Sequence, residues 1–216
     1  MTLAGTIAFA LLALLINIAA GYAALRRRSV SGSGAVAGAL VGSVILIAGG
    51  FLYWIMLMLF FASSSAASRV GGREKRRLEQ MHERGSERDY VQVAANAGIA
   101  TLAVLLLRTT GDARFGVAAA AAFASVNADT WSSELGVLSR RPPRSIITWR
   151  RLEPGTSGGV SPAGTLAGLA GSLFIAGWYA VAHLVPGLLS TLVATASSLG
   201  TGASAGTLLL AEIGRA

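Results

Sequence analysis

The residues with the clearest chemical potential form an acidic motif, Asn127-Ala-Asp-Thr-Trp-Ser-Ser-Glu-Leu-Gly136, at the end of a long alanine-rich apolar run. The motif carries two carboxylates and three neutral polar side chains: Asp129, Glu134, Asn127, Thr130 and Ser133. Carboxylates at membrane depth are costly and persist where they pair with a cation, line a wet cavity or do chemistry. Because Mg²⁺ typically takes one or two carboxylates together with phosphate oxygens and waters, this supply of ligands fits a metal and phosphate site.

The spacing of the two carboxylates limits how they can act together. On a regular helix, residues five apart are rotated by about 140°, so Asp129 and Glu134 do not share a face. Either the helix breaks or begins near Asn127–Asp129, with Asp129 as an N-cap, or the two acids divide the work. In the second case Asp129 holds a metal, and Glu134 holds a second metal or an arginine. A purely structural alternative has Asp129 capping a helix and Glu134 pairing with a loop arginine, and the cost of burying these acids argues against it.

A basic loop, residues 139–151, follows the motif and contains Pro142-Pro143, which stiffens the chain. Arginine presents a planar fork that binds phosphate oxygens in a bidentate manner. We expect phosphate contacts from the arginines that lead into the next turn, Arg144, Arg150 and Arg151. For Arg140 and Arg141, phosphate contact and simple anchoring to anionic lipid are equally good interpretations.

A glycine-rich turn comes next, at Glu153-Pro-Gly-Thr-Ser-Gly-Gly-Val-Ser-Pro162. Glycines allow backbone N–H groups to point at an anion, and a helix beginning near Ser161 would add the positive end of its dipole. We expect phosphate binding by five residues of this turn: Gly155, Thr156, Ser157, Gly158 and Gly159. The turn lacks the lysine and the spacing of a P-loop.

A second basic segment, residues 69–89, precedes another apolar run. Its acidic residues recur four or five apart beside lysine and arginine, a pattern typical of a solvated, salt-bridged helix. The functional alternative is a basic gate for an anionic lipid head group, with Arg69 at its start. Gln92 and Asn96 follow at i, i+4 spacing on one helix face, where they either line a cavity or bond across helices.

The elements that position these residues are membrane helices. Of the 216 residues, 53% are hydrophobic and 13% are charged, whereas a soluble domain has about 25% charged residues. The 27 glycines suit close helix packing in a bilayer. The absence of cysteine excludes disulfides, thiolate metal ligands and a cysteine nucleophile. Basic residues follow the first apolar run rather than precede it, the reverse of a secretory signal, so we expect a retained transmembrane helix.

Hydropathy predicts a single all-α membrane domain over residues 1–216, a polytopic transmembrane bundle of about seven spans. The predicted spans are 3–25, 34–49, 51–68, 91–107, 114–128, 161–184 and 187–213. Gly49-Gly50 separates the second from the third, which are either two short spans or re-entrant helices. Lysine and arginine concentrate in the loops after the odd-numbered spans, at about 26–33, 69–90 and 137–160.

The positive-inside rule makes these basic loops cytoplasmic. It places the N-terminus outside, the C-terminus in the cytoplasm and the candidate site at the cytoplasmic face, in what we expect to be the inner membrane of the cell. Small residues on exposed helix faces are compatible with a homodimer. We expect no nucleic-acid partner.

The acidic motif, Ile147-Thr148 and Pro154-Gly-Thr-Ser-Gly-Gly-Val-Ser161 together resemble the integral membrane family of phytyl-phosphate kinase and transmembrane protein 19. Val91-Gln-Val-Ala-Ala-Asn96, after a basic loop, is also similar to that family, and the resemblance covers about residues 60–172. It implies an enzyme that converts a phytyl or polyprenyl monophosphate to its diphosphate with CTP or another nucleoside triphosphate. A more distant similarity to dolichol kinase and phosphatidate cytidylyltransferase implies a shared CTP and Mg²⁺ site.

The resemblance also implies roles for residues. Asp129 and Glu134 would hold Mg²⁺ with Asn127 nearby, and these two acids and Arg144 would be catalytic. Nucleotide phosphates would contact Asn127, Thr130, Ser133, Arg150, Arg151 and the 155–159 turn. The lipid head group would face Arg69, Gln92 and Asn96.

The chain departs from the family pattern near its end. Family members carry an acidic Asp-Ser-Leu-Leu-Gly stretch in a late helix, where this chain has Gly206-Thr-Leu-Leu-Leu-Ala-Glu-Ile-Gly214, with Glu212 as the substitute acid.

Two other functions would use nearly the same residues. A cytidylyltransferase would transfer CMP and release diphosphate, and a transporter or lipid-binding protein would use the acids as an ion site.

Overall fold

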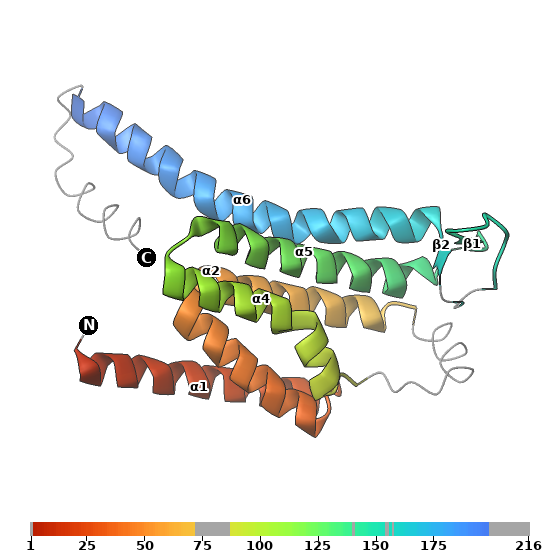
Figure 1. The fold of residues 1–216 in the computed structure, drawn as a ribbon, viewed down its shortest axis with the longest axis horizontal. Coiled ribbons are helices and arrows are strands. Elements are labelled where there is room, and N and C mark those ends of the chain that lie inside the picture. Colours follow the sequence, from red (N-terminus) through yellow and green to blue (C-terminus); the bar gives the residue numbers. More distant parts are fainter. Residues whose placement is uncertain (1, 72–86, 140, 154–155, 157, 199–216) are drawn as a thin grey trace. The chain divides into compact units, whose positions relative to one another are not determined.

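The computed structural model describes residues 2–71, 87–139, 141–153, 156 and 158–198, the last twelve by their backbone alone. Long helices make up most of this part of the chain (Figure 1): α1 (Leu3–Arg26), α2 (Gly32–Arg69), α4 (Tyr90–Thr110), α5 (Ala113–Gly136) and α6 (Pro162–Ser198). The chain divides within α6 into two compact units, residues 1–175 and 176–216. Every residue assigned to the predicted site lies in the first unit.

Four helical stretches of the described residues are long and apolar enough to cross a membrane: Leu3–Arg26, Gly32–Arg69, Tyr90–Thr110 and Pro162–Pro186. They confirm the prediction of a mostly helical membrane protein. Helix α5 has 24 residues but lies outside this group, because the polar residues of the acidic motif lower its hydropathy. The seven crossings and their orientation stay predictions. The break predicted between spans 161–184 and 187–213 is wrong, because α6 continues through Pro186 to Ser198. Residues 199–213 of the predicted last span lie outside the described residues.

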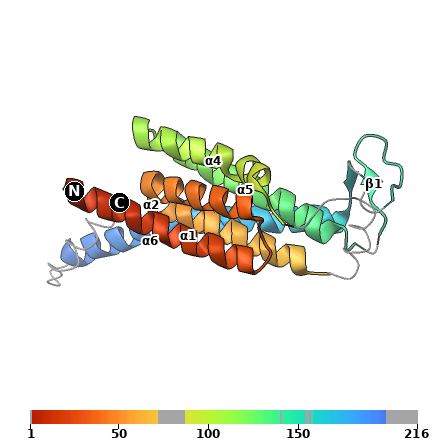
Figure 2. The ribbon, with the colours of Figure 1, turned by 90° about the horizontal axis from the view of Figure 1, so that it is seen from below.

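Helix α2 reverses direction at Gly50. This glycine has φ 72° and ψ −171° inside an otherwise helical segment, a conformation open almost only to glycine. A straight helix of 38 residues would separate its ends by about 55 Å, yet Arg69 Nη2 donates a hydrogen bond to Ser29 Oγ at 3.0 Å. The halves 32–49 and 51–69 therefore form a helical hairpin, as Figures 1 and 2 show. The predicted separation of two helices at Gly49-Gly50 is confirmed.

The basic loops lie together at one end of the first unit. Val30, in the loop between α1 and α2, pairs with Arg88, just before α4, in a parallel bridge. Gly71, after α2, lies against the side chain of Leu138, after α5. The turn at Gly50 and the turn between α4 and α5 lie at the opposite end (Figure 1). The fold thus gathers the segments that the charge pattern predicts to share one side of the membrane.

Helix α5 packs closely on the first half of α6. Three glycines, Gly164, Gly168 and Gly171, recur on one face of α6. A Cβ added at these positions would lie 3.0 to 3.2 Å from backbone oxygens of α5, so the absence of side chains lets the two backbones approach. The rings of Trp131 on α5 and Phe174 on α6 stack, with centroids 5.9 Å apart. These contacts fix which face of the acidic motif meets α6.

The loop between α5 and α6 is itself folded. Its strands β1 (Arg144–Ser145) and β2 (Gly159–Val160) pair antiparallel. Ser145 Oγ accepts hydrogen bonds from the backbone N–H groups of Ile147 and Thr148, at 3.3 and 3.2 Å. The all-α prediction omits this sheet, because two-residue strands are too short to show an alternation of polar and apolar residues.

Candidate functional site

The acidic motif lies on one unbroken helix, because α5 has no interruption before Gly136. The N-cap of α5 is Asp112, not Asp129. The predicted break near Asn127–Asp129 and the predicted capping role of Asp129 are therefore wrong. The reason is tertiary packing: this half of α5 is held between α2 and the glycines of α6, which outweighs the modest helix propensity of Asn, Asp, Thr and Ser.

The two carboxylates leave α5 on different sides, as their spacing on a regular helix requires. Asp129 is exposed and Glu134 is half-buried. Ser133 is also exposed, and it follows Asp129 by four residues on the same face. Thr130 is half-buried, and its hydroxyl donates to the carbonyl of Val126 at 3.0 Å. Of the two arrangements predicted for the acids, the division between two positions is the one that this helix allows.

Asn127 is the most deeply buried residue of the motif, with 0% of its surface exposed. Its Oδ1 accepts hydrogen bonds from Ser63 Oγ at 2.9 Å and Ser64 Oγ at 3.3 Å, both on α2. Its Nδ2 donates to the carbonyl oxygen of Gly171 on α6 at 2.8 Å. These bonds tie three helices together and use both acceptor positions of the amide oxygen. The structure therefore places Asn127 in a cross-link between helices.

Glu134 points toward α2 and the segment before α4. Ser68 Oγ donates to Glu134 Oε1 at 2.7 Å, and Arg88 interacts electrostatically with the same carboxylate. Arg88 Nη1 donates to Ser65 Oγ at 3.2 Å. Burial lowers the pKa of the Arg88 guanidinium below its ordinary value, and the negative charge of Glu134 opposes that shift. We name these four residues the charge cluster.

Arg88 is held in place by backbone contacts with the loop between α1 and α2. Its N–H donates to the carbonyl of Ser29 at 3.3 Å, and its carbonyl accepts the N–H of Ser31 at 3.0 Å. Gly34 lies so close to the Arg88 carbonyl that a Cβ would overlap the oxygen. The guanidinium lies 5.9 Å from the centroid of the Phe61 ring. Arg88 is therefore a positioned cation at the junction of α2 and α4.

A pocket of about 450 Å³ lies between the end of α5 and the glycine-rich turn, and we name it the glycine-turn pocket. Residues predicted to bind phosphate line it together with one further arginine: Ser133, Thr156, Gly158, Gly159 and Arg141. The fold thus brings the end of the acidic motif and the glycine-rich turn to one cavity. For Arg141, which the sequence leaves open between lipid anchoring and phosphate contact, this position favours phosphate contact.

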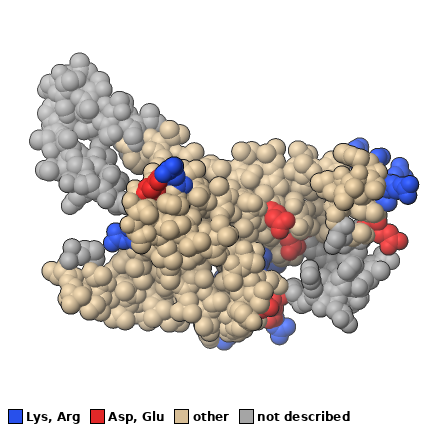
Figure 3. Space-filling model, in the orientation of Figure 1, with Lys and Arg blue, Asp and Glu red and all other residues tan. Residues whose placement is uncertain are grey.

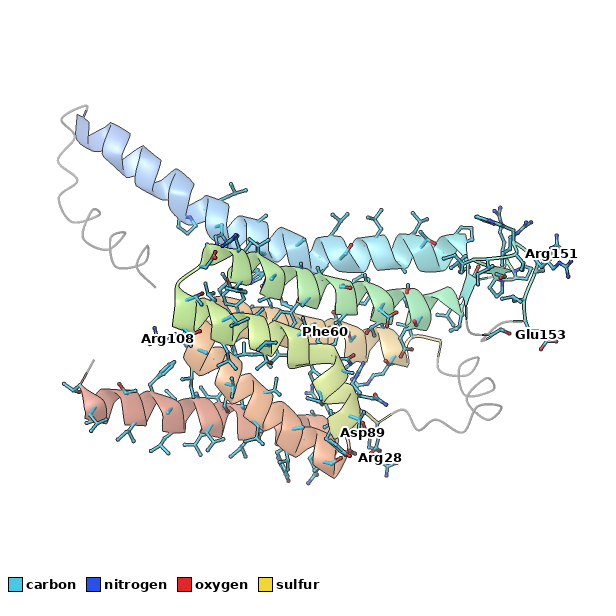
Figure 4. The ribbon with its side chains drawn as sticks, viewed as in Figure 1. Arg28, Phe60, Asp89, Arg108, Arg151 and Glu153 are labelled. Atoms are coloured by element: carbon cyan, nitrogen blue, oxygen red, sulfur yellow. The ribbon has the colours of Figure 1, made fainter. Side chains whose placement is uncertain are left out.

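A second pocket, of about 870 Å³, adjoins the first, because Arg141 and Ser161 line both. Arg144 and Arg151 complete its basic wall, while Arg150 is exposed on the same loop. Figure 3 shows basic side chains gathered at this end of the first unit, and Figure 4 shows Arg151 projecting from the loop. Several arginines around one pocket are an arrangement that suits an anion such as phosphate.

The glycine-rich turn uses part of its own hydrogen-bonding capacity. The N–H groups of Thr156 and Gly159 each donate to a carbonyl oxygen within the turn, at 3.2 Å. Ser161 Oγ caps α6 by accepting a backbone N–H at 3.1 Å. Phosphate binding at these positions would therefore depend on hydroxyl groups and arginines more than on a backbone nest. The predicted contacts of Gly155 and Ser157 lie outside the described residues.

The three residues predicted to face a lipid head group have different surroundings. Arg69 donates to Ser29 Oγ and joins α2 to the preceding loop. Gln92 is exposed on α4. Asn96 lines an apolar cavity between α1, α2 and α4, in agreement with the cavity-lining alternative. The helix predicted within residues 69–89 falls mostly on 72–86, which lie outside the described residues.

Sequence reasoning misses the serines of α2 and Arg88. Ser64 and Ser68 stand four apart in an apolar helix, and this shared face is the signal that could have found them. Arg88 immediately precedes Asp89, whose side chain accepts the N–H of Gln92 and caps α4. A basic residue next to a helix cap is fixed at a helix end, which sets it apart from the other arginines of its loop.

Comparisons with known proteins agree with the predicted family resemblance. A profile described as "Integral membrane protein DUF92" matches residues 15–211. Protein PGR of Arabidopsis thaliana is 36% identical over 172 residues, which cover 73% of this chain and 59% of that protein. An uncharacterized membrane protein of Methanocaldococcus jannaschii is 32% identical over 150 residues, which cover 69% of this chain and 61% of that protein. The chain thus spans about three fifths of the length of these relatives. No solved structure matches.

Proposed function

Because the chain belongs to the DUF92 family of integral membrane proteins, we propose that it is a Mg²⁺-dependent kinase for an isoprenoid monophosphate. The expected donor is CTP or another nucleoside triphosphate, and the expected acceptor is phytyl or polyprenyl phosphate. The observation that carries the proposal is the glycine-turn pocket, which is lined by Ser133 of the acidic motif, Thr156 of the turn and Arg141.

The proposed reaction moves one phosphoryl group. An oxygen of the lipid phosphate attacks the γ-phosphorus of CTP, the bond from that phosphorus to the β–γ bridging oxygen breaks, and CDP and the lipid diphosphate form. The acceptor is already an anion, so the step needs no general base. Positioning of the two substrates and neutralisation of their charge are then the main tasks of the protein.

The proposal assigns these tasks to two sides of α5. Asp129 shares a helix face with Ser133, which lines the glycine-turn pocket, and we assign the nucleotide phosphates to that side. Arg144 and the other arginines of the adjoining pocket supply positive charge there. Glu134 and Arg88 lie on another face of α5, and we assign the lipid phosphate to them. Glu134 is two residues before the end of α5 at Gly136, which lines the glycine-turn pocket, so the proposal has the two substrates meet at this helix end.

The residues at hand suit Mg²⁺. The described residues contain no group of three or more His, Cys, Asp or Glu side chains that could hold a metal, but Mg²⁺ needs only one or two carboxylates when phosphates and waters complete its shell. We assign Asp129 as the carboxylate ligand on the nucleotide side and Glu134, with the Ser68 hydroxyl beside it, on the lipid side. A bound Mg²⁺ would neutralise charge on the transferred phosphoryl group. Asn127 supports α5 through its bonds to neighbouring helices.

Turnover by the purified protein in lipid nanodiscs tests the proposal. With CTP, Mg²⁺ and phytyl phosphate we expect CDP and phytyl diphosphate in equal amounts. Asp129→Asn should lower kcat/KM by about 100-fold or more, which corresponds to roughly 3 kcal/mol of lost transition-state stabilisation. It should leave the Tm unchanged because Asp129 is exposed. Glu153→Gln, which neutralises another exposed acid, is the matched control.

The products separate the proposal from its rivals. Diphosphate and a CDP-lipid as the only products would replace the kinase with a cytidylyltransferase. If no isoprenoid phosphate yields a nucleotide-dependent product and proteoliposomes show cation-dependent flux, a transporter takes its place. Full activity of Asp129→Asn would remove that carboxylate from the proposed site.

A further inference from the structure

An apolar cavity lies between α1, both halves of α2 and α4, and Arg88 of the charge cluster is among its lining residues. Its volume is about 90 Å³, several times the roughly 10–15 Å³ that a single water molecule needs. It follows α1 from Asn17 to Ala24, a distance of about 10 Å at the helical rise per residue. Alanines, glycines and larger side chains such as Leu57 and Phe60 form its walls. The cavity therefore extends along α1 and has room for part of a hydrocarbon chain.

Few of the residues that line this cavity have polar side chains. The Asn17 amide is already engaged, since its Nδ2 donates to the Ala13 carbonyl at 2.8 Å and its Oδ1 accepts from Trp54 Nε1 at 3.0 Å. Of the described residues that line the cavity, Arg88 alone is charged. An apolar channel with one arginine matches an amphiphile that has an apolar tail and an anionic head.

We propose that this cavity binds the hydrocarbon tail of an isoprenoid monophosphate and that Arg88 binds its phosphate. The identity of the lipid rests on the proposed function. The location of the site rests on the charge complementarity between the Arg88 guanidinium and a phosphate. Apolar walls favour a hydrocarbon chain, and a guanidinium binds phosphate oxygens in a bidentate manner. The bound phosphate would then lie within the charge cluster, beside Glu134.

Gly38 offers a way to fill the cavity without disturbing its walls. It lines the cavity, and a Cβ added there meets no atom within 4 Å. Gly38→Leu should therefore occupy the cavity and weaken phytyl phosphate binding about tenfold or more. Gly98→Leu is the matched control, because Gly98 is also a helical glycine with no atom within 4 Å of an added Cβ and is not among the residues that line the cavity.

Substitutions that remove or keep the charge of Arg88 test whether it binds the lipid phosphate. Arg88→Gln should weaken phytyl phosphate binding about tenfold or more, while Arg88→Lys should retain part of the affinity, because lysine keeps the charge but loses the planar fork. Phytol, which has the tail without the phosphate, should bind wild type and Arg88→Gln equally. Equal affinity of wild type and Arg88→Gln for phytyl phosphate would remove Arg88 from the site.

The measurement uses the full chain in nanodiscs, titrated with phytyl phosphate in the absence of nucleotide, with ligand-induced thermal stabilisation as the readout. The cavity assignment is overturned if wild type binds no phytyl phosphate, if Gly38→Leu binds as wild type does, or if Gly98→Leu weakens binding equally. Binding that depends on Gly38 and Arg88 without any turnover would refute the kinase and support the cavity. Turnover of phytyl phosphate that Gly38→Leu leaves unchanged would support the kinase and refute the cavity.

Discussion

Asn127 shows how an amide inside an apolar bundle can hold helices together. Its oxygen accepts two serine hydroxyls from α2, and its nitrogen donates to α6. An amide left without partners in an apolar interior is costly, so the three bonds specify how α2, α5 and α6 meet. The carboxylates of the same motif depend on that arrangement, because Asn127 fixes the rotation of α5 about its axis.

Asn127→Ala should lower the free energy of unfolding by about 1–2 kcal/mol, because it removes the amide bonds and leaves the Gly171 carbonyl without its donor. Thermal unfolding in detergent measures this change, with Ser133→Ala on the exposed face as the control. An unchanged Tm together with an altered Mg²⁺ dependence of turnover would instead support the metal-binding role predicted for Asn127.

Among the elements, the α2 hairpin depends most on a single backbone conformation. Gly50 adopts φ 72° and ψ −171° with no atom within 4 Å of an added Cβ. Gly50→Ala should therefore be destabilising through backbone strain alone, by about 1–3 kcal/mol. Gly98→Ala, at a regular helical position with equally open space, should be neutral or slightly stabilising. A comparison of their Tm values tests the hairpin, and equal effects would contradict it.

The contact between α5 and α6 depends on close backbone approach. A Cβ at Gly168 would lie 3.2 Å from the carbonyl oxygen of Ala128, so Gly168→Leu should push the helices apart and cost about 1–3 kcal/mol. It should also lower nucleotide turnover, since both helices line the glycine-turn pocket. Gly177→Leu, where an added Cβ meets no atom within 4 Å, is the control for a leucine on the same helix. A stable, fully active Gly168→Leu protein would show that the close packing is dispensable.

Local sequence patterns predict the helices, the reversal at Gly49-Gly50 and the gathering of basic loops, because hydropathy and charge act along the chain. These patterns do not predict structure that depends on contacts between segments far apart in the sequence. The polar motif suggests a broken helix, whereas packing on α2 and α6 keeps α5 continuous. Glu134 meets Ser68 and Arg88 across the fold, and neither pairing is visible in local spacing. The pairing of β1 with β2 likewise joins short segments across a loop.

At the scale of the whole molecule, the described parts of the three basic loops lie together at one end of the first unit. The chain has no cysteine, so single introduced cysteines can report its orientation without further changes. Ile147, in the α5–α6 loop, is 86% exposed, and Thr110, at the turn after α4, is also exposed. The charge pattern predicts that the loop is cytoplasmic.

A membrane-impermeant maleimide should therefore label Thr110→Cys in intact cells and Ile147→Cys only in inverted vesicles. Labelling of Ile147→Cys from outside would reverse the orientation and place the proposed nucleotide pockets away from cytosolic nucleotides. Nucleotide turnover by each variant provides the control for folding.

The unbroken course of α5 also fixes how far along the helix axis its two carboxylates lie. Counted from Ala113, Asp129 is about 24 Å along the helix and Glu134 about 32 Å. The hydrocarbon core of a bilayer is about 30 Å thick. If α5 stands along the membrane normal with Ala113 at one boundary, Glu134 reaches the opposite boundary and Asp129 stops about 6 Å short of it. The two carboxylates then flank the boundary between hydrocarbon and head groups, so the lipid phosphate of the proposed reaction would react without leaving its own leaflet.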